Sequence, residues 1–258
     1  MMIDTHCHID QFPSPESLVQ ECETEGIRTI AVTNLPSHFM MALPHLKEMR
    51  FVTPALGMHP MSAKNGFREL GEFRRLAREA NFIGEIGLDF SPAGKETRSI
   101  QEQVFEDVLG AISDRSRFVT LHSRGAETEV IAALKRNRVH GAVFHWFSGS
   151  DSRHAAAISN GHFMSFNAAM IRTVKGKRLL AATPLDRILV ESDGPFARVS
   201  GSPASPLGIG CVYQEVANTF RMESEETAFQ IAANFNLACG NNLPSDKLVS
   251  GKQSLFPT

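Results

Sequence analysis

The sequence has few features of a membrane protein, a secreted disulfide protein or a binder of long duplexes. No apolar run in its 258 residues reaches the roughly 18 residues of a membrane span. The four cysteines have neither metal-finger nor redox spacing, and the first residues lack the pattern of a signal peptide. Both observations favour a reducing, cytoplasmic setting. The formal net charge is -2, so any contact with nucleic acid should depend on a local site rather than a basic surface.

Short β-rich runs alternate with helical stretches along the chain, as in α/β proteins. The first helical stretch starts after Ser14, an N-cap residue, has Pro15 at its first position and stops at Gly26. Apolar residues at helical spacing recur in residues 100–112 and 224–235. We expect eight strands, at residues 2–4, 29–33, 52–58, 82–88, 118–122, 142–147, 162–166 and 188–192.

Eight strands that are each followed by a helix predict a single-domain α/β fold, the closed (β/α)8 or TIM barrel. The alternative is an open doubly wound sheet. We expect one domain over residues 1–258, with a core from 2 to 240 and a C-terminal tail from 241 to 258. The Gly/Ser/Pro-rich segment 198–210 follows the last strand, and in a barrel it would lie on the active-site face.

Histidines and acids lie at the ends of the expected strands. Because side chains alternate along a strand, His6 and His8 should share one face, while Cys7 points towards the helices and packs there. All strand ends of a parallel barrel converge on one rim. We therefore expect residues far apart in the sequence to meet around one centre. The residues concerned are His6, His8, His59, Glu85, His122, Arg124, His145 and Asp193.

These imidazole and carboxylate groups suit two divalent cations, Mg2+, Mn2+ or Zn2+. Glu85 is central enough to bridge both cations with its two oxygens. A pair of cations can polarise a phosphoryl oxygen and activate water. Arg124 is expected to hold a substrate phosphate through its planar guanidinium, the alternative being a surface ion pair. His59 is expected either to contact substrate or to cap the loop before Pro60.

Two further acids should lie one layer below the cations, because Asp4 and Glu191 precede other site residues by two positions. A buried carboxylate needs a partner, and a hydrogen bond to a ligand imidazole would supply one. Three aromatic residues near the strand ends are expected to pack rather than bind. They are Trp146, which should turn away from the centre, and Phe90 and Phe196, which should anchor the core or loops.

The segments "DTHCHID", "LGMHP", "GEIGLDF", "LHSRGA", "VFHWFSG" and "ESDGPF" resemble, in order, the motifs of the TatD family of metal-dependent deoxyribonucleases. That family has amidohydrolase-type barrels. The resemblance implies hydrolysis of phosphodiester bonds in DNA, with 3′ to 5′ exonuclease action and with Asp193 and Glu85 as catalytic residues. It also implies a ligand set in which one cation is bound by His6, His8 and Asp193, the second by His122 and His145, and both by Glu85.

The chain departs from the family pattern at three places. Gly125 stands where an acid is common, Trp146 where cysteine is frequent, and "GSPASP" replaces an Asn-x-Pro element. "HWFSG", "ESDGPF" and "GSPASP" look more like the TatD-type component of Qat anti-phage defence systems, which would imply other Qat proteins as partners. Two other functions stay open. One is an amidohydrolase-type enzyme with a non-nucleic substrate, which would often bridge its cations with a modified lysine; the other is a non-catalytic scaffold subunit of a defence complex.

Overall fold

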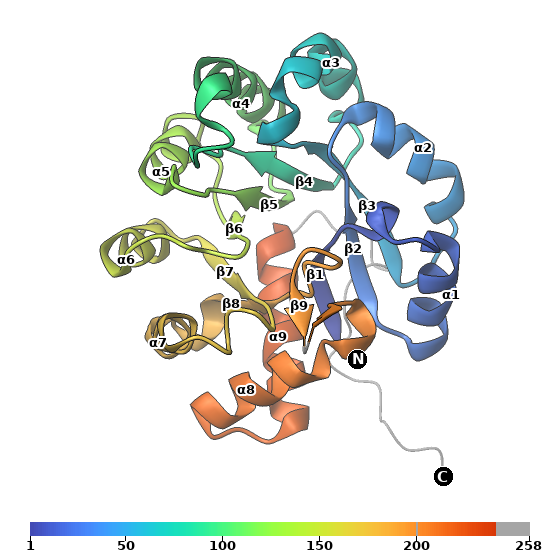
Figure 1. Ribbon diagram of the computed structural model, residues 1–258, viewed down its shortest axis with the longest axis vertical. Helices are drawn as coiled ribbons and strands as arrows, with labels where there is room; N and C mark the ends of the chain where they lie inside the picture. Colours follow the sequence, from blue (N-terminus) through green and yellow to red (C-terminus); the bar gives the residue numbers. More distant parts are fainter. Residues whose placement is uncertain (200, 241–258) are drawn as a thin grey trace.

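The computed structural model describes residues 1–199 and 201–240, so the expected tail at 241–258 lies outside the described residues. Eight parallel strands lie side by side in chain order, with helices around them, as Figure 1 shows. Within the described ranges, every helix is too short or too polar to cross a membrane. The strands are β1 (Ile3–Cys7), β2 (Arg28–Val32), β3 (Val52–Met58), β4 (Phe82–Gly87), β5 (Phe118–His122), β6 (Val143–Phe144), β7 (Phe163–Phe166) and β8 (Ile188–Val190).

Contacts between the ends of β8 and β1 join the two sides of the sheet. The amide of Asp193 donates to the carbonyl of His6 at 2.9 Å, and the amide of His8 donates to the carbonyl of Gly194 at 2.8 Å. The predicted barrel is therefore confirmed, and the open sheet is not found. The first and last motifs of the sequence meet at this seam.

Apart from α9 (Ser224–Cys239), the helices lie around the barrel and cover the outer face of the strands (Figure 1). The helix α1 starts with Pro15 and stops at Gly26, as predicted, and Gly26 has the left-handed φ of 64° that ends many helices. The helices are α1 (Pro15–Glu25), α2 (Pro36–Leu46), α3 (Ala63–Leu76), α4 (Arg98–Ile112), α5 (Glu127–Arg136), α6 (Asp151–Ser159), α7 (Val174–Ala182), α8 (Gly210–Phe220) and α9 (Ser224–Cys239).

One helix, α9, covers the end of the barrel at which the strands begin. The ring of Phe235 lies 6.3 Å from that of Phe82 and 5.4 Å from that of Phe118, the first residues of β4 and β5. The side chain of Asn234 donates to the carbonyl of Ile188, the first residue of β8, at 2.7 Å. Because this end is covered, the opposite end, here called the mouth, is the one a substrate can reach.

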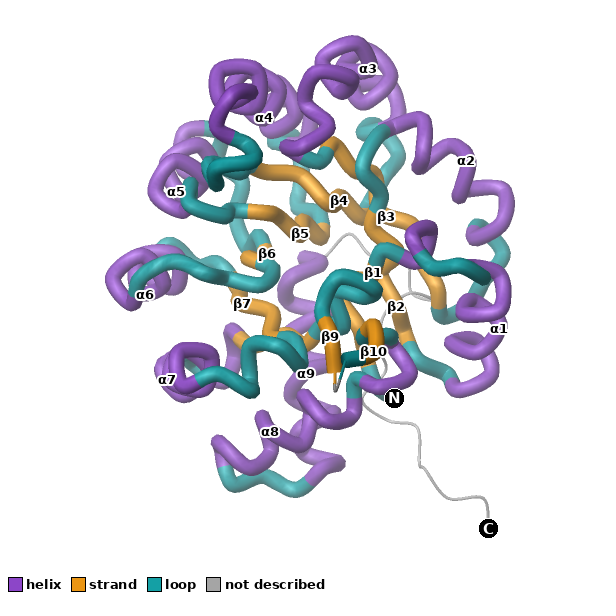
Figure 2. The backbone as a smooth tube through the Cα atoms, viewed as in Figure 1, coloured by secondary structure: helices purple, strands orange, loops and turns teal. Residues whose placement is uncertain are grey.

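Strand bounds at the mouth differ from those expected. The strand β1 runs on to Cys7, and β6 has only two residues. Trp146 has a φ of 35°, a left-handed conformation that cannot continue an extended strand. The expected loop at 198–210 includes a short hairpin of β9 (Arg198–Val199) and β10 (Ser202–Pro203), labelled in Figure 2. The Ala204 amide donates to the Ala197 carbonyl at 2.8 Å, which ties the base of this hairpin.

Candidate metal centre

The carboxylate of Glu85, near the end of β4, lies at the centre of the histidines at the mouth. Glu85 is 1% exposed, so water compensates little of its charge. Its Oε1 faces the rings at the ends of β5 and β6, and its Oε2 faces those at the ends of β1 and β3. The distances are 2.8 Å to His122 Nδ1 and 3.1 Å to His145 Nε2 from Oε1, and 3.2 Å to His8 Nε2, 3.4 Å to His59 Nε2 and 3.5 Å to His6 Nε2 from Oε2.

His6, inside β1, and His8, directly after it, turn to the same side, as the alternation of a strand predicts. Their Nε2 atoms lie 3.3 Å apart, and each lies 3.8 Å from Oδ1 of Asp193. Cys7 turns the other way and is buried with Leu18 and other apolar side chains under α1. The expected packing role of Cys7 is therefore confirmed.

Three sets of donor atoms in the described residues are compact enough to hold a cation, with all atoms of a set within 4.8 Å of one another. In one of them the three residues expected around the first cation come together. The other two place His122 and His145 in separate sets, although both rings face Oε1 of Glu85. The sets are His6, His8 and Asp193; His6, Glu85 and His145; and His59, Glu85 and His122.

The charges of this centre fit cations. Every ion pair that Glu85 and Asp193 form within the described ranges is with a histidine, never with lysine or arginine. Asp193 Oδ1 and His8 Nδ1 are buried and have no hydrogen-bond partner in the same ranges. Buried carboxylates without a full countercharge are costly. Divalent cations would supply that charge and use these donor atoms, so the residues present fit the metals expected from the sequence.

His6 is held in a form suited to ligation. Burial lowers the pKa of His6 to about 3, so the ring is neutral near pH 7. Its Nδ1 lies 2.8 Å from the hydroxyl of Thr120, a residue of β5, which leaves Nε2 to face the centre. Thr120 was not predicted from the sequence, because a threonine inside a strand carries no signal for this role.

Protons compete with cations at two other groups. Burial raises the pKa of Asp193 to about 7, although His145 opposes the shift. Burial disfavours the charged form of His145, but the carboxylates of Glu85, Glu191 and Asp193 raise its pKa well above the ordinary value. Without a cation, His145 therefore holds a proton near neutral pH, and Asp193 holds one in part of the molecules.

We expect metal affinity to increase with pH. A cation needs Asp193 as a carboxylate and His145 as a neutral ring, so binding displaces protons from both. Below about pH 7 the affinity should fall roughly tenfold per pH unit for each proton displaced. Calorimetric titration with Mn2+ between pH 5.5 and 8.5, in buffers of different ionisation enthalpy, measures both affinity and protons released. An affinity independent of pH over this range would contradict the prediction.

His122 is held by Asp89, an acid that was not predicted from the sequence. Its Nε2 lies 2.8 Å from Oδ2 of Asp89, while its Nδ1 faces Glu85. The amide of Asp89 donates to the side chain of Gln101 at 2.7 Å, which fixes the loop after β4. The available signal was position: Asp89 lies two residues after the end of β4 in "GEIGLDF", four residues after Glu85.

Replacing Asp89 should weaken metal binding without removing a ligand. The carboxylate of Asp89 holds the imidazole of His122 at Nε2, the ring atom that faces away from Glu85. Asp89→Ala should therefore lower the affinity for Mn2+ roughly 10- to 100-fold. Asp89→Asn keeps an oxygen acceptor and should recover part of the loss. Asp186→Ala, a change at a 60% exposed side chain far from the mouth, is the control in the same titration. Equal affinities for all these proteins would show that Asp89 has no such role.

Of the two acids expected below the cations, only Glu191 lies against an imidazole. Its Oε1 is 3.4 Å from Nδ1 of His145, and Asn167 also donates to it at 3.0 Å. Asp4 is buried as expected, but the hydrogen bond expected to a ligand imidazole is not found among the described residues. Its Oδ1 accepts the backbone amides of His6 at 3.1 Å and Ser192 at 2.9 Å. Asp4 therefore helps to join β1 to the segment after β8, because it accepts a backbone amide from each.

The two expected substrate contacts lie at the mouth. His59 caps the turn before Met61, whose amide donates to His59 Nδ1 at 3.1 Å, so the capping role is confirmed. Burial lowers the pKa of His59 to about 4, and the neutral ring therefore carries its proton on Nε2. Arg124 is exposed after β5 and forms no ion pair within residues 1–199 and 201–240, so the surface ion pair considered as its alternative is not found.

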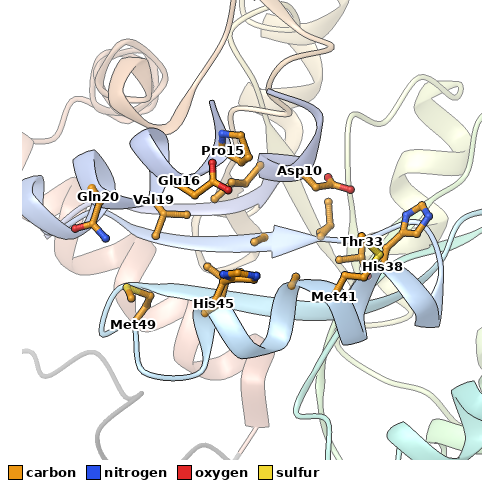
Figure 3. A pocket seen from close by; sticks show the side chains of 15 residues that line it. Asp10, Pro15, Glu16, Val19, Gln20, Thr33, His38, Met41, His45 and Met49 are labelled. Atoms are coloured by element: carbon orange, nitrogen blue, oxygen red, sulfur yellow. The ribbon is translucent and has the colours of Figure 1, made fainter. Parts of the chain in front are cut away.

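A cavity of about 550 Å3 lies elsewhere, between α1 and α2 on the outside of β2 (Figure 3). Its walls are mainly apolar, with Val19, Ala42 and Leu46 among them, and Asp10 and His38 lie near one end. None of the expected ligands lines this cavity. The chemistry expected of the protein therefore belongs to the mouth.

Comparison with known proteins agrees with this geometry. A family model described as "TatD related DNase" matches residues 3–240. The metal-dependent hydrolase YabD of Bacillus subtilis is 26% identical over 242 residues, covering 88% of this chain and 94% of YabD. The metal-dependent hydrolase YcfH of Escherichia coli is 28% identical over 210 residues, covering 76% of this chain and 78% of YcfH.

A solved structure extends the likeness to three dimensions. The crystal structure of YjjV, a TatD homologue from Escherichia coli, matches with a TM-score of 0.79 at 26% sequence identity. The match covers 90% of this chain and 95% of YjjV. Three observations agree: the barrel fold, the buried histidine and carboxylate groups at its mouth, and the match over residues 3–240. This chain therefore belongs to the TatD-related DNase family of metal-dependent hydrolases.

Proposed function

We propose that this protein hydrolyses phosphodiester bonds in DNA and shortens strands from their 3′ ends. The observation that carries the proposal is the division of the histidines between the two oxygens of Glu85 at the open end of the barrel. Two divalent cations, Mg2+, Mn2+ or Zn2+, would be held there. The proposed ligands are His6, His8 and Asp193 for one cation, His122 and His145 for the other, and Glu85 for both.

The cations, when bound, polarise the phosphoryl oxygens and lower the pKa of water. Asp193 orients the attacking water and accepts its proton, a role supported by an Oδ1 that lacks a hydrogen-bond partner in the described residues. In the metal-free protein, burial would raise the pKa of Glu85, but the charge of His145 and the hydrogen bond from His122 hold it well below the ordinary value. Glu85 is therefore already a carboxylate when cations bind, and the bound cations would preserve its charge.

Two side chains at the rim, those of His59 and Arg124, would bind the substrate. His59 presents an Nε2–H towards the centre and can donate it to a phosphate oxygen. The exposed guanidinium of Arg124 can hold two oxygens of the same phosphate. Together they would place the phosphorus atom over Glu85, in reach of the water that Asp193 orients.

Membership of the family is also compatible with the two other functions, a hydrolase of non-nucleic substrates and a non-catalytic scaffold subunit. A hydrolase of amides or lactones is disfavoured because the bridging position holds Glu85, whose two oxygens face different histidines, in place of a modified lysine. A scaffold without activity is disfavoured because all expected ligands gather at the mouth. Association with other Qat proteins and residence in the cytoplasm stay predictions from the sequence.

The test is an assay of the purified chain with Mg2+, Mn2+ and Zn2+ on DNA labelled at either end, in single-stranded and duplex form, with RNA alongside. We expect progressive loss from the 3′ end of DNA. Turnover of amide, lactone or phosphotriester substrates without cleavage of DNA would favour the first alternative. Saturable metal binding without turnover of any substrate would favour the scaffold.

A further inference from the structure

Phe196 differs from the expectation that it would anchor the core or a loop. Its side chain is 56% exposed, although it follows Asp193 by only three residues. Its backbone is fixed, because its amide donates to the carbonyl of Asp193 at 2.9 Å. The ring meets the imidazole of His8 edge to face, with centroids 4.9 Å apart and planes at 83°. An exposed aromatic ring is thus held against the metal centre by a short, hydrogen-bonded turn.

Other aromatic rings near the mouth are already engaged. Trp146 is half-buried and packs against the core, as expected from the sequence. Phe90 is half-buried and lies under the guanidinium of Arg98, 4.1 Å from the ring centroid. An exposed ring is common on a protein surface, but Phe196 adjoins side chains that are almost fully buried: His8 is 3% and Asp193 is 2% exposed.

We infer that Phe196 is a platform on which an unpaired nucleobase stacks, next to the phosphate that is cleaved. This inference rests on the proposed function. A phosphate over Glu85 would have its own nucleotide within reach of the ring that touches His8. A base inside a duplex has both faces covered by its neighbours, so only an unpaired base can offer one to Phe196. The site should therefore prefer single-stranded or frayed ends.

The charge of the protein supports stacking as a source of affinity. With a net charge of -2, the chain has no general attraction for the DNA backbone. Stacking on an aromatic side chain needs no charge, and it tolerates any sequence because every base has a π-face. We therefore expect affinity with weak sequence preference, dependent on the terminal base.

The test measures binding separately from hydrolysis. Short single-stranded oligonucleotides with phosphorothioate linkages carry a dye at the 5′ end and, at the 3′ end, either a normal nucleotide or an abasic one. Fluorescence anisotropy gives their dissociation constants with the Mn2+-loaded protein. Phe196→Ala should raise the dissociation constant for the normal oligonucleotide roughly 5- to 100-fold and barely change that for the abasic one. Phe196→Trp should bind like the wild type.

A matched control is Phe229→Ala, at a residue that is 43% exposed on α9, at the opposite end of the barrel. Wild-type affinity in Phe196→Ala would overturn the inference. Equal weakening for the normal and abasic oligonucleotides would also overturn it, since Phe196 would then act through His8. If the wild type discriminates between the two oligonucleotides but cleaves no DNA, stacking stands and the proposed hydrolysis fails.

Discussion

His8→Ala is expected to lower kcat/KM for DNA by about 1,000-fold or more, whereas Cys7→Ser leaves it nearly unchanged. Metal ions contribute several kcal/mol to stabilising charge in the transition state, and each 1.36 kcal/mol is about tenfold in rate. His8 Nε2 lies 3.2 Å from Glu85 and 3.8 Å from Asp193, so its loss removes a ligand from the middle of the centre. Cys7, its neighbour in sequence, is fully buried on the other face of β1.

The comparison separates loss of the centre from loss of the fold. Cys7→Ser places a hydroxyl in an apolar cluster and should cost about 1 to 3 kcal/mol of unfolding free energy. It should nevertheless bind metal like the wild type. Elemental analysis after dialysis, steady-state kinetics and denaturant unfolding give the three quantities. Similar losses of activity in two folded variants would mean that the two side chains do not face opposite ways.

Glu85→Gln is expected to have the other large effect, loss of both cations and of hydrolysis by about 1,000-fold or more. The amide has nearly the shape of the carboxylate but lacks its charge, and a single neutral oxygen cannot bridge two ions. A second readout comes from the metal-free protein. Since Glu85 is the largest contributor among the acids that raise the pKa of His145, the pKa of that ring should fall in the variant. Nuclear magnetic resonance titration of the histidine rings measures it.

The control is a glutamate that is equally buried but belongs to none of the compact sets of donor atoms found in the described residues. Glu127 on α5 is 1% exposed and pairs with Arg153 at 2.8 Å. Glu127→Gln should lower stability and leave metal stoichiometry unchanged. Retention of two cations by Glu85→Gln would show that its carboxylate does not bridge, and the proposed ligand set would then be wrong.

Much of the fold could be predicted because its signals are local and periodic. The alternation of β-rich and helical stretches predicts the barrel, and Ser14, Pro15 and Gly26 predict where α1 begins and ends. Ends of parallel strands must converge, so the positions of His6 and Asp193 in the sequence already predict that they meet. Strand bounds were less predictable: the short β6 depends on the backbone conformation of Trp146, which no composition reveals.

What the sequence by itself determined was the fold class, the identity of the residues at the mouth and the side of β1 on which His8 and Cys7 lie. Only the tertiary structure decided which side chains form hydrogen bonds with these residues and hold them in place. Thr120 behind His6 lies 114 positions away, and Asp89 behind His122 lies 33 positions away. The exposure of Phe196 was also decided there. The physical reason is that periodicity sets the direction of a side chain, whereas its partners and its burial depend on segments that only the closed barrel brings together.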